Sequence, residues 1–284
     1  MSSALRIACG EFGRVALLDM DRSLIRHAHP HCHVLLKVEG ADTQFVVGSR
    51  IVPLSDRTAV LVNGWQMHAY QHRLESPNTL ILALYIEPAW LNLFRSGWLA
   101  SGSPGFFQQP SGEITPRIRR LAHDLAAEMM CRPGARSDQK SLLCDLMIAV
   151  IERFSQWSNH PRSIRSLNSS TITDPRIRRI VTTMQEDDKN TMNVIELARK
   201  AGLSRAHFFR MFEASTNVSP RVYFNVLRME RAVDANIGSD DNVADVGERL
   251  GFGEPAHFSR FFRDHAGVAP SEFRSVARFG GHTV

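Results

Sequence analysis

Histidines crowd into one short stretch of the N-terminal third. Four of them occupy every second position from residue 27 to residue 33, so on an extended strand they share one face, and a carboxylate at residue 39 has the same parity. A fifth histidine follows a later apolar segment and a turn. Three imidazoles with a carboxylate suit a divalent transition metal, and imidazoles also donate hydrogen bonds to polar or anionic ligands. The residues are His27, His29, His31, His33, His68 and Glu39.

A second group of chemically capable side chains forms an internal repeat in the C-terminal third. The motif His-Phe-x-Arg-x-Phe starts at His207 and again at His257, and a glycine followed by an apolar residue precedes each copy. A proline follows each copy at the same distance, at Pro220 and Pro270. Two copies at matched spacing indicate a duplicated structural unit, in which the second turn is one residue longer.

Each copy has the pattern of a helix-turn-helix. Asn193 and Asn242 are typical N-caps of a short first helix, and Gly202 and Gly251 stand where a tight turn needs a positive φ. Ser204 is the expected cap of the next helix in the first copy. The phenylalanines of each second helix lie four residues apart and face the core, so the opposite side is free for a partner. That side carries Arg205, Ala206, Phe209 and Arg210 in the first copy and Pro255, Ala256, Ser259 and Arg260 in the second.

The elements that position these residues fall into two groups. The first third predicts an antiparallel barrel or sandwich, because short apolar or alternating segments are separated by turn residues. Helices then start at Pro116 and Ser137, and the second of them carries a broad apolar stripe that packs on the barrel or, in part, on a second copy of the chain. Asp174 and Pro175 open a helical region that runs to Phe279. The expected strands are 15–18, 33–38, 43–47, 59–62 and 80–86.

The composition limits the class of protein. The 284 residues are 43% hydrophobic and 22% charged, which is ordinary for a globular chain with two domains. No stretch approaches the roughly 18 apolar residues that span a bilayer, and the N-terminus lacks the pattern of a signal peptide. The four scattered cysteines predict free thiols in a reducing cytoplasm. The net charge of +5 permits nucleic-acid binding, but no segment is strongly basic. A prediction of DNA binding therefore rests on where the arginines lie and not on the total charge.

Residues 175–279 resemble the AraC/XylS family of transcriptional regulators. Beyond the repeat, the likeness includes an arginine and an alanine four residues apart, Arg228 and Ala232, in the long helix between the two units. This sequence departs from the family pattern at Asn217, which stands where the second unit has a glycine, and at Gly247, which replaces the commoner alanine. A closing motif comprises Gly267, Pro270, Phe273 and Arg274.

The resemblance implies that each unit lays its second helix in the major groove, on successive turns of one face of a duplex. We expect arginine contacts to guanine and apolar contacts to the methyl groups of thymine. The DNA-contacting positions that it assigns are Arg205, Ala206, Phe209, Arg210, Glu254, Pro255, Ala256, Ser259 and Arg260.

The histidine-rich segment resembles a cupin barrel, in which a His-x-His pair, a later Glu and a more distant His surround the interior. Family regulators usually use such a barrel as a small-molecule sensor without a metal. Three interpretations stay open: effector contacts by His29, His31, His33 and His68; a metal held by these residues with Glu39; and histidines that only solvate the rim of the barrel. Pro30 interrupts the strand, so His27 is not included.

The sequence therefore predicts an α+β protein of two domains that is not an enzyme and has no cofactor. Residues 1–157 form a cupin-like sensing and dimerisation domain, 158–173 a linker, and 174–284 a DNA-binding domain with helix-turn-helix units at about 193–212 and 242–262. We expect a homodimer, joined through helices within 116–157, that binds operator or promoter DNA and a small-molecule effector. RNA polymerase is a further expected partner, and a membrane is not. The alternatives are a cupin metalloenzyme fused to a DNA-binding module and a ligand-independent dimeric regulator.

Overall fold

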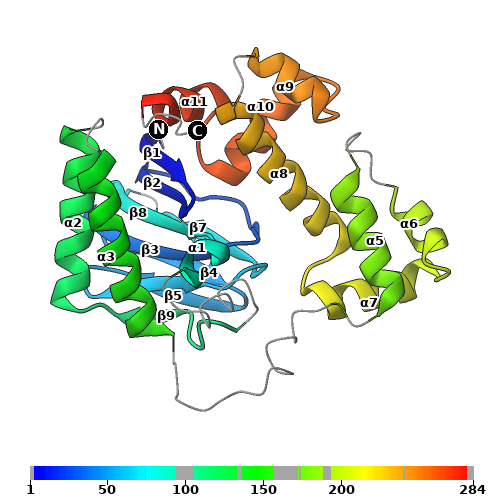
Figure 1. Cartoon of the computed structure of the whole chain (residues 1–284), viewed down its shortest axis with the longest axis horizontal. Coiled ribbons are helices and arrows are strands. Elements are labelled where there is room, and N and C mark those ends of the chain that lie inside the picture. The colour runs from blue at the N-terminus through cyan, green and yellow to red at the C-terminus, as the bar shows by residue number, and fades with distance from the viewer. Residues whose placement is uncertain are drawn as a thin grey trace.

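The computed structural model describes residues 3–73, 75–93, 105–132, 136–155, 172, 174–187, 193–238 and 241–279. Within this part of the chain, an N-terminal β-rich domain is followed by a group of helices, as Figure 1 shows. The expected α+β class is confirmed. The expected linker lies outside the described residues apart from Ile172, so the domain boundaries stay predictions. None of the described helices is long and apolar enough to cross a membrane.

The described residues of the N-terminal domain include two antiparallel sheets. The larger has the strand order β1-β2-β8-β3-β6-β9 and the smaller the order β5-β4-β7. All five strands expected from the sequence lie within observed strands, whereas β1, β5, β7 and β9 were not expected. The strands are β1 Ser3–Gly10, β2 Gly13–Met20, β3 Cys32–Gly40, β4 Thr43–Val47, β5 Arg50–Leu54, β6 Thr58–Val62, β7 His68–Gln71, β8 Thr79–Ile86 and β9 Ser111–Glu113, and a short helix, α1 Pro88–Asn92, follows β8.

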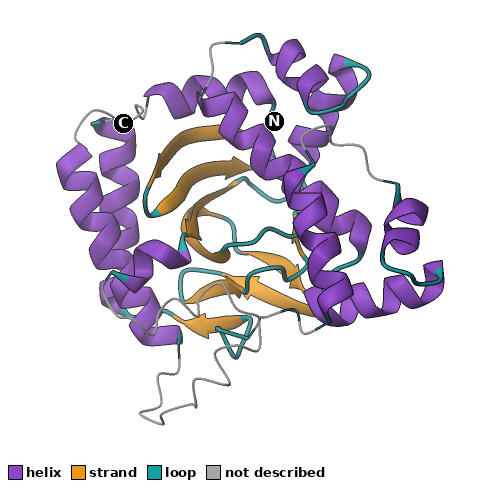
Figure 2. Cartoon of the chain, turned by 45° about the vertical axis from the view of Figure 1, so that its right-hand side comes forward, coloured by secondary structure: helices purple, strands orange, loops and turns teal. Residues whose placement is uncertain are grey.

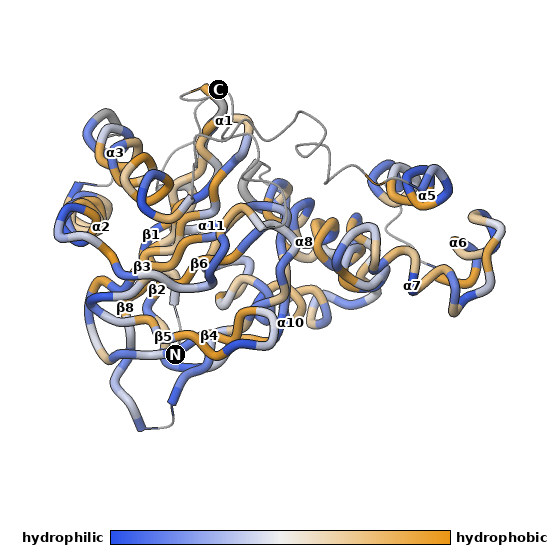
Figure 3. Tube along the Cα trace, turned by 90° about the horizontal axis from the view of Figure 1, so that it is seen from below, coloured by the Kyte–Doolittle hydropathy of each residue, from blue (hydrophilic) through white to orange (hydrophobic). Residues whose placement is uncertain are grey.

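Strands β2, β3 and β8 of the larger sheet are buried on both faces, which explains why their sequences are nearly continuous apolar runs. Alternate residues, such as Val34 and Leu36 of β3, pack against helices α2 (Pro116–Cys131) and α3 (Arg136–Phe154). Figure 3 shows polar and apolar residues alternating along these helices. The apolar stripe of α3 is thus buried within the chain, against its own barrel, and dimerisation stays a prediction. The buried stripe residues are Leu143, Leu146, Met147, Val150 and Ile151.

The described part of the C-terminal region contains seven helices, and short connections separate those within each helix-turn-helix. They include two short–long pairs, α6 with α7 and α9 with α10, joined by the long helix α8, which crosses from one pair to the other (Figures 1 and 2). The helices are α5 Pro175–Glu186, α6 Val194–Lys200, α7 Arg205–Thr216, α8 Pro220–Gly238, α9 Val243–Arg249, α10 Pro255–Ala266 and α11 Pro270–Phe279.

The local signals read from the sequence are present at the helix ends. Asn193 and Asn242 cap α6 and α9, and Ser204 caps α7 through the amide of His207. Gly202 has a φ of 68° and Gly251 a φ of 74°, a backbone region that residues with a Cβ rarely adopt. Each helix-turn-helix therefore begins and turns where the sequence indicates.

The two units meet the barrel in different ways. The buried side chains of the second unit, among them Phe258 and Phe262, belong to the same apolar cluster as the interior of the barrel. Helix α11 packs along β1, where the amide of Ala4 donates to the Glu272 carboxylate at 3.2 Å. The first unit has a separate cluster, to which the barrel contributes little of its described apolar surface.

Candidate functional site

The second helix of each helix-turn-helix turns one side inward and leaves the other free. Phe208 and Phe212 of α7 are fully buried, as are Phe258 and Phe262 of α10. Of the nine expected DNA-contacting residues, seven are exposed and two, Phe209 and Ser259, are half-buried. The exposed residues are Arg205, Ala206, Arg210, Glu254, Pro255, Ala256 and Arg260.

Two of the three arginines on these faces, Arg210 and Arg260, have no ion-pair partner among the described residues. Both guanidinium groups are therefore available to an outside anion or base edge. Phe209 has a mixed role, because its ring packs edge-on against Phe208, with centroids 6.4 Å apart, while Arg205 lies over it at 5.9 Å.

Helix α8 ties the two units together through arginines. The guanidinium of Arg228 lies 3.7 Å from the centroid of Phe252 and donates to the carbonyl of Leu250, so it holds the turn of the second unit. Arg231 donates to the carbonyls of Gln185 and Asp187 at the end of α5. These contacts give the Arg228 element seen in the sequence a structural role, since they position both units relative to one helix.

Three of the predicted histidines come together in the interior of the N-terminal domain. One ring nitrogen of each of His29, His33 and His68 lies within 4.8 Å of the others, and all three residues are buried. His33 is on β3, directly opposite Tyr85 of β8, and the two rings stack with centroids 4.1 Å apart. His68 begins β7, and its backbone pairs with that of His27 in an isolated bridge. We call His29, His33 and His68 the histidine group.

Burial sets the protonation of these rings. It lowers the pKa of His68 to about 4, and it lowers those of His29 and His33 well below the usual value, with neighbouring histidines adding to the effect. The group is therefore neutral at physiological pH. Ring nitrogens Nε2 of His33 and of His68 are buried without a hydrogen-bond partner among the described residues. Such a group costs about 1–3 kcal/mol if it stays unpaired.

His31 and Glu39 lie apart from the histidine group. The chain before Cys32 is not a strand, so the strict alternation of the histidines does not hold, and His31 turns toward Glu87, with Nε2 3.2 Å from its carboxylate. That hydrogen bond holds the pKa of Glu87 below its usual value. Glu39 is exposed, because a register shift between Lys37 and Glu39 breaks the alternation of β3.

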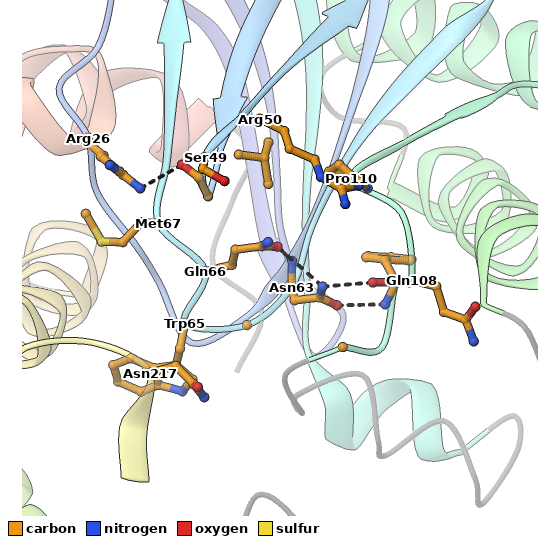
Figure 4. Close-up of a pocket in the computed structure, with 15 residues that line it drawn as sticks. Arg26, Ser49, Arg50, Asn63, Trp65, Gln66, Met67, Gln108, Pro110 and Asn217 are labelled. Carbon is orange, nitrogen blue, oxygen red and sulfur yellow. Dashed lines mark hydrogen bonds between the residues drawn. The ribbon is translucent and has the colours of Figure 1, made fainter. Parts of the chain in front are cut away.

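A cavity of about 600 Å³ lies beside the histidine group, on the other side of the turn at residues 63–67. Figure 4 shows Trp65, Gln66 and Arg26 around it, together with Asn217 from the end of α7, so both domains contribute to its wall. Trp65 has a φ of 62° and stacks on Tyr223 of α8 with centroids 4.4 Å apart. None of the four predicted effector-binding histidines is among its described lining residues.

The cavity was not foreseen from the sequence. Its lining residues are scattered over the barrel, the segment around Phe107 and the DNA-binding region, so no local motif marks them. The one available signal is the run Asn63-Gly64-Trp65-Gln66, a turn that carries a half-buried tryptophan between two apolar strands. The amide of Trp65 donates to the carbonyl of His29, which links the cavity wall to the histidine group.

Comparisons with known proteins agree with this architecture. Residues 13–147 match the profile of the AraC-like ligand binding domain, and residues 197–275 match that of a helix-turn-helix domain. The transcriptional activator RhaS of Citrobacter koseri is 29% identical over 263 residues, which cover 90% of this chain and 89% of RhaS. The chain belongs to the AraC family of transcriptional regulators.

Other regulatory proteins match over shorter stretches. The Msm operon regulatory protein of Streptococcus mutans is 29% identical over 133 residues, and ArgR of Pseudomonas aeruginosa is 28% identical over 131 residues. These stretches cover 45% and 40% of the relatives, so the chain matches less than half of their length. Apo ToxT from Vibrio cholerae has the same fold, with a TM-score of 0.58 over 95% of this chain and 99% of ToxT at 13% identity.

Proposed function

We propose that this chain regulates transcription by binding duplex DNA with α7 and α10. The observation that carries the proposal is the repeated exposed face, in which Arg210 and Arg260 occupy equivalent positions and lack partners within the described residues. The buried phenylalanines behind each face fix the helix orientation. The family of regulators to which the chain belongs supports the same function.

We further infer that a small-molecule effector controls DNA binding. The N-terminal domain matches a ligand-binding family, and a cavity of about 600 Å³ is large enough for a small metabolite. Arg26 and Arg50 on its wall favour an anionic group. Because Asn217 also lines the cavity, a ligand there touches both domains. Direct effector contact by His29, His31, His33 and His68 stays a prediction. Turn 63–67 separates these histidines from the cavity, so they would meet an effector bound in the cavity across this turn.

We infer that the chain acts by binding and not by turnover. It belongs to a family of regulators, which favours this role over the alternative of a fused metalloenzyme. Dimerisation, a cytoplasmic location and contact with RNA polymerase belong to the same proposal. Dimerisation through α2 and α3 has to use the outer faces of these helices, since the apolar stripe of α3 is buried within the chain.

The test of DNA binding uses the full chain, because the second unit shares its core with the barrel. Duplexes are selected from a random library, and the best is footprinted. We expect protection of two major-groove segments about 10 base pairs apart. The affinity should fall steeply with salt, since phosphate contacts release counterions. Protection of a single groove segment, or no selected sequence at low salt, contradicts the proposal.

A further inference from the structure

We propose that the histidine group, His29, His33 and His68, binds one divalent transition-metal ion, with Zn²⁺ as the best-suited occupant. This goes beyond the proposed function, which needs no metal. The three residues come from different parts of the barrel: the segment before β3, the start of β3 and the start of β7. Their ring nitrogens already lie within 4.8 Å of one another in the interior of the domain.

Backbone carbonyls fix how two of these rings carry their protons. Nδ1 of His29 lies 2.9 Å from the carbonyl oxygen of His31, and Nδ1 of His68 lies 2.9 Å from that of Gln66. A carbonyl only accepts, so each Nδ1 must carry the hydrogen, and in a neutral ring the lone pair is then on Nε2. Metal-binding histidines are typically held in this way, with one ring nitrogen bonded to a carbonyl and the other facing the ion.

A hydrogen bond at Nδ1 also fixes the proton of the third ring, that of His33. Nε2 of His29 lies 3.1 Å from Nδ1 of His33, so His33 donates there and its own Nε2 carries the remaining lone pair. Two lone pairs, on Nε2 of His33 and of His68, are thus buried without a donor among the described residues. An ion at this place would give both of them a partner. The exposed fractions of the three residues are 6%, 3% and 1% in chain order, so bulk water does not reach these nitrogens as a hydrogen-bond partner.

The ligand type and spacing favour zinc. Neutral imidazoles suit Zn²⁺, Cu²⁺, Ni²⁺ and Fe²⁺ better than Mg²⁺ or Ca²⁺, which prefer oxygen. At Zn–N distances of about 2.0–2.1 Å, two tetrahedral ligand atoms lie about 3.4 Å apart. One ring nitrogen of each residue lies within 4.8 Å of the others, so the rings have to close by up to about 1.4 Å, and the hydrogen bond from Nδ1 of His33 to Nε2 of His29 has to be exchanged for the ion. A three-histidine site leaves the fourth position to water.

This set differs from the one that the cupin resemblance implies. Glu39 is exposed, and His31 is bonded to Glu87, so neither is placed to be a ligand. The site also lies close to the interface with the second helix-turn-helix. The ring of His27, whose backbone pairs with that of His68, is 6.3 Å from the ring of His265 in α10. An ion that fixes β7 against β3 would therefore stiffen the barrel directly beneath α10.

Metal content tests the site directly. The full chain, prepared without an affinity tag, is stripped with a chelator, reloaded with Zn²⁺ and desalted before elemental analysis. We expect about one zinc per chain and a higher melting temperature with zinc, because the ion binds only the folded barrel. Loss of a group that only hydrogen-bonds to a metal ligand lowers metal affinity by about 10- to 100-fold. His33→Ala and His68→Ala remove a ligand itself, so they should lower zinc affinity by more than this. His72→Ala and the exposed His123→Ala, which remove imidazoles elsewhere, should retain the metal.

A variant that keeps a ligand guards against simple loss of folding. In His68→Cys loaded with Co²⁺, a thiolate-to-cobalt absorption band should appear that the cobalt-loaded parent lacks. Far-UV circular dichroism confirms that each variant is folded. The proposal is overturned if the parent retains no zinc, if folded His68→Ala retains zinc as the parent does, or if folded His68→Cys shows no thiolate band. None of these results depends on DNA binding.

Discussion

The two helix-turn-helix units share a turn, a buried aromatic pair and an exposed arginine, yet they are stabilised differently. The first unit has its own apolar cluster and a serine cap on α7. The second unit shares a cluster with the barrel, and the N-cap of α10, Glu254, makes no side-chain capping hydrogen bond. One repeat thus has an apolar core of its own, and the core of the other continues into the barrel. A change in the barrel should therefore reach the second unit first.

The largest expected effect comes from the buried phenylalanines. Phe212→Ala and Phe262→Ala should each cost roughly 3–5 kcal/mol of unfolding free energy, because each leaves a large cavity at a fully buried site. Hydrogen exchange followed by mass spectrometry separates the two. Phe212→Ala should expose amides in α5–α7 and the first half of α8, whereas Phe262→Ala should raise exchange around α10 and also in β1 and β2. Unchanged exchange in these strands would show that the shared core does not couple the two regions.

Removal of the exposed arginines should have a smaller effect, and on DNA binding alone. Arg210→Ala and Arg260→Ala should each weaken binding to a selected duplex by about 1–3 kcal/mol, since each loses a base contact, while helical content is unchanged. Arg120→Ala on α2 removes the same charge from an exposed site far from α7 and α10 and serves as the control. Early melting of the arginine variants would mean that the facing of these helices is assigned backwards.

The smallest effect concerns the position that distinguishes the first helix of each unit. Ala198 in α6 corresponds to Gly247 in α9, where an added Cβ would lie 3.0 Å from Cβ of the fully buried Phe258. Gly247→Ala should therefore lower the stability by about 1 kcal/mol, because crowding outweighs the better helix propensity. Ala198→Gly should cost at least as much, because it lowers helix propensity and removes a buried methyl group. Chemical denaturation measures both, and a stabilising Gly247→Ala would contradict the close packing of the second unit.

Local signals carried most of what could be predicted from the sequence. The caps at Asn193 and Ser204 and the turns at Gly202 and Gly251 depend on neighbouring residues, so a pattern of residue types is sufficient to find them. The strands β2, β3, β6 and β8 of the larger sheet were found because apolar residues occupy both of their faces. Strand β1 was missed, since its alternation is weak and half of it is only partly buried.

The candidate sites depend on contacts that the sequence does not contain. The alternating histidines suggested one strand face, but the strand begins only at Cys32. The rings of the histidine group meet because β3, β7 and the segment before β3 come together in the fold. A register shift after Lys37 removes Glu39 from the set. The merging of the second unit with the barrel likewise arises from packing between distant segments, which no local period reveals.

Helix α8 also sets the distance between the two helix-turn-helix units. Its 19 residues run without a break from Pro220 to Gly238, which at about 1.5 Å per residue is a length of roughly 28 Å, a little less than one turn of duplex DNA. If both units bind as proposed, this helix sets the phase between them as well as their separation. A single residue inserted in its middle would rotate the second unit by about 100° about the helix axis, so one added base pair, worth about 36°, would not restore alignment. The length of α8 would thus determine the separation of the two DNA segments that the units bind.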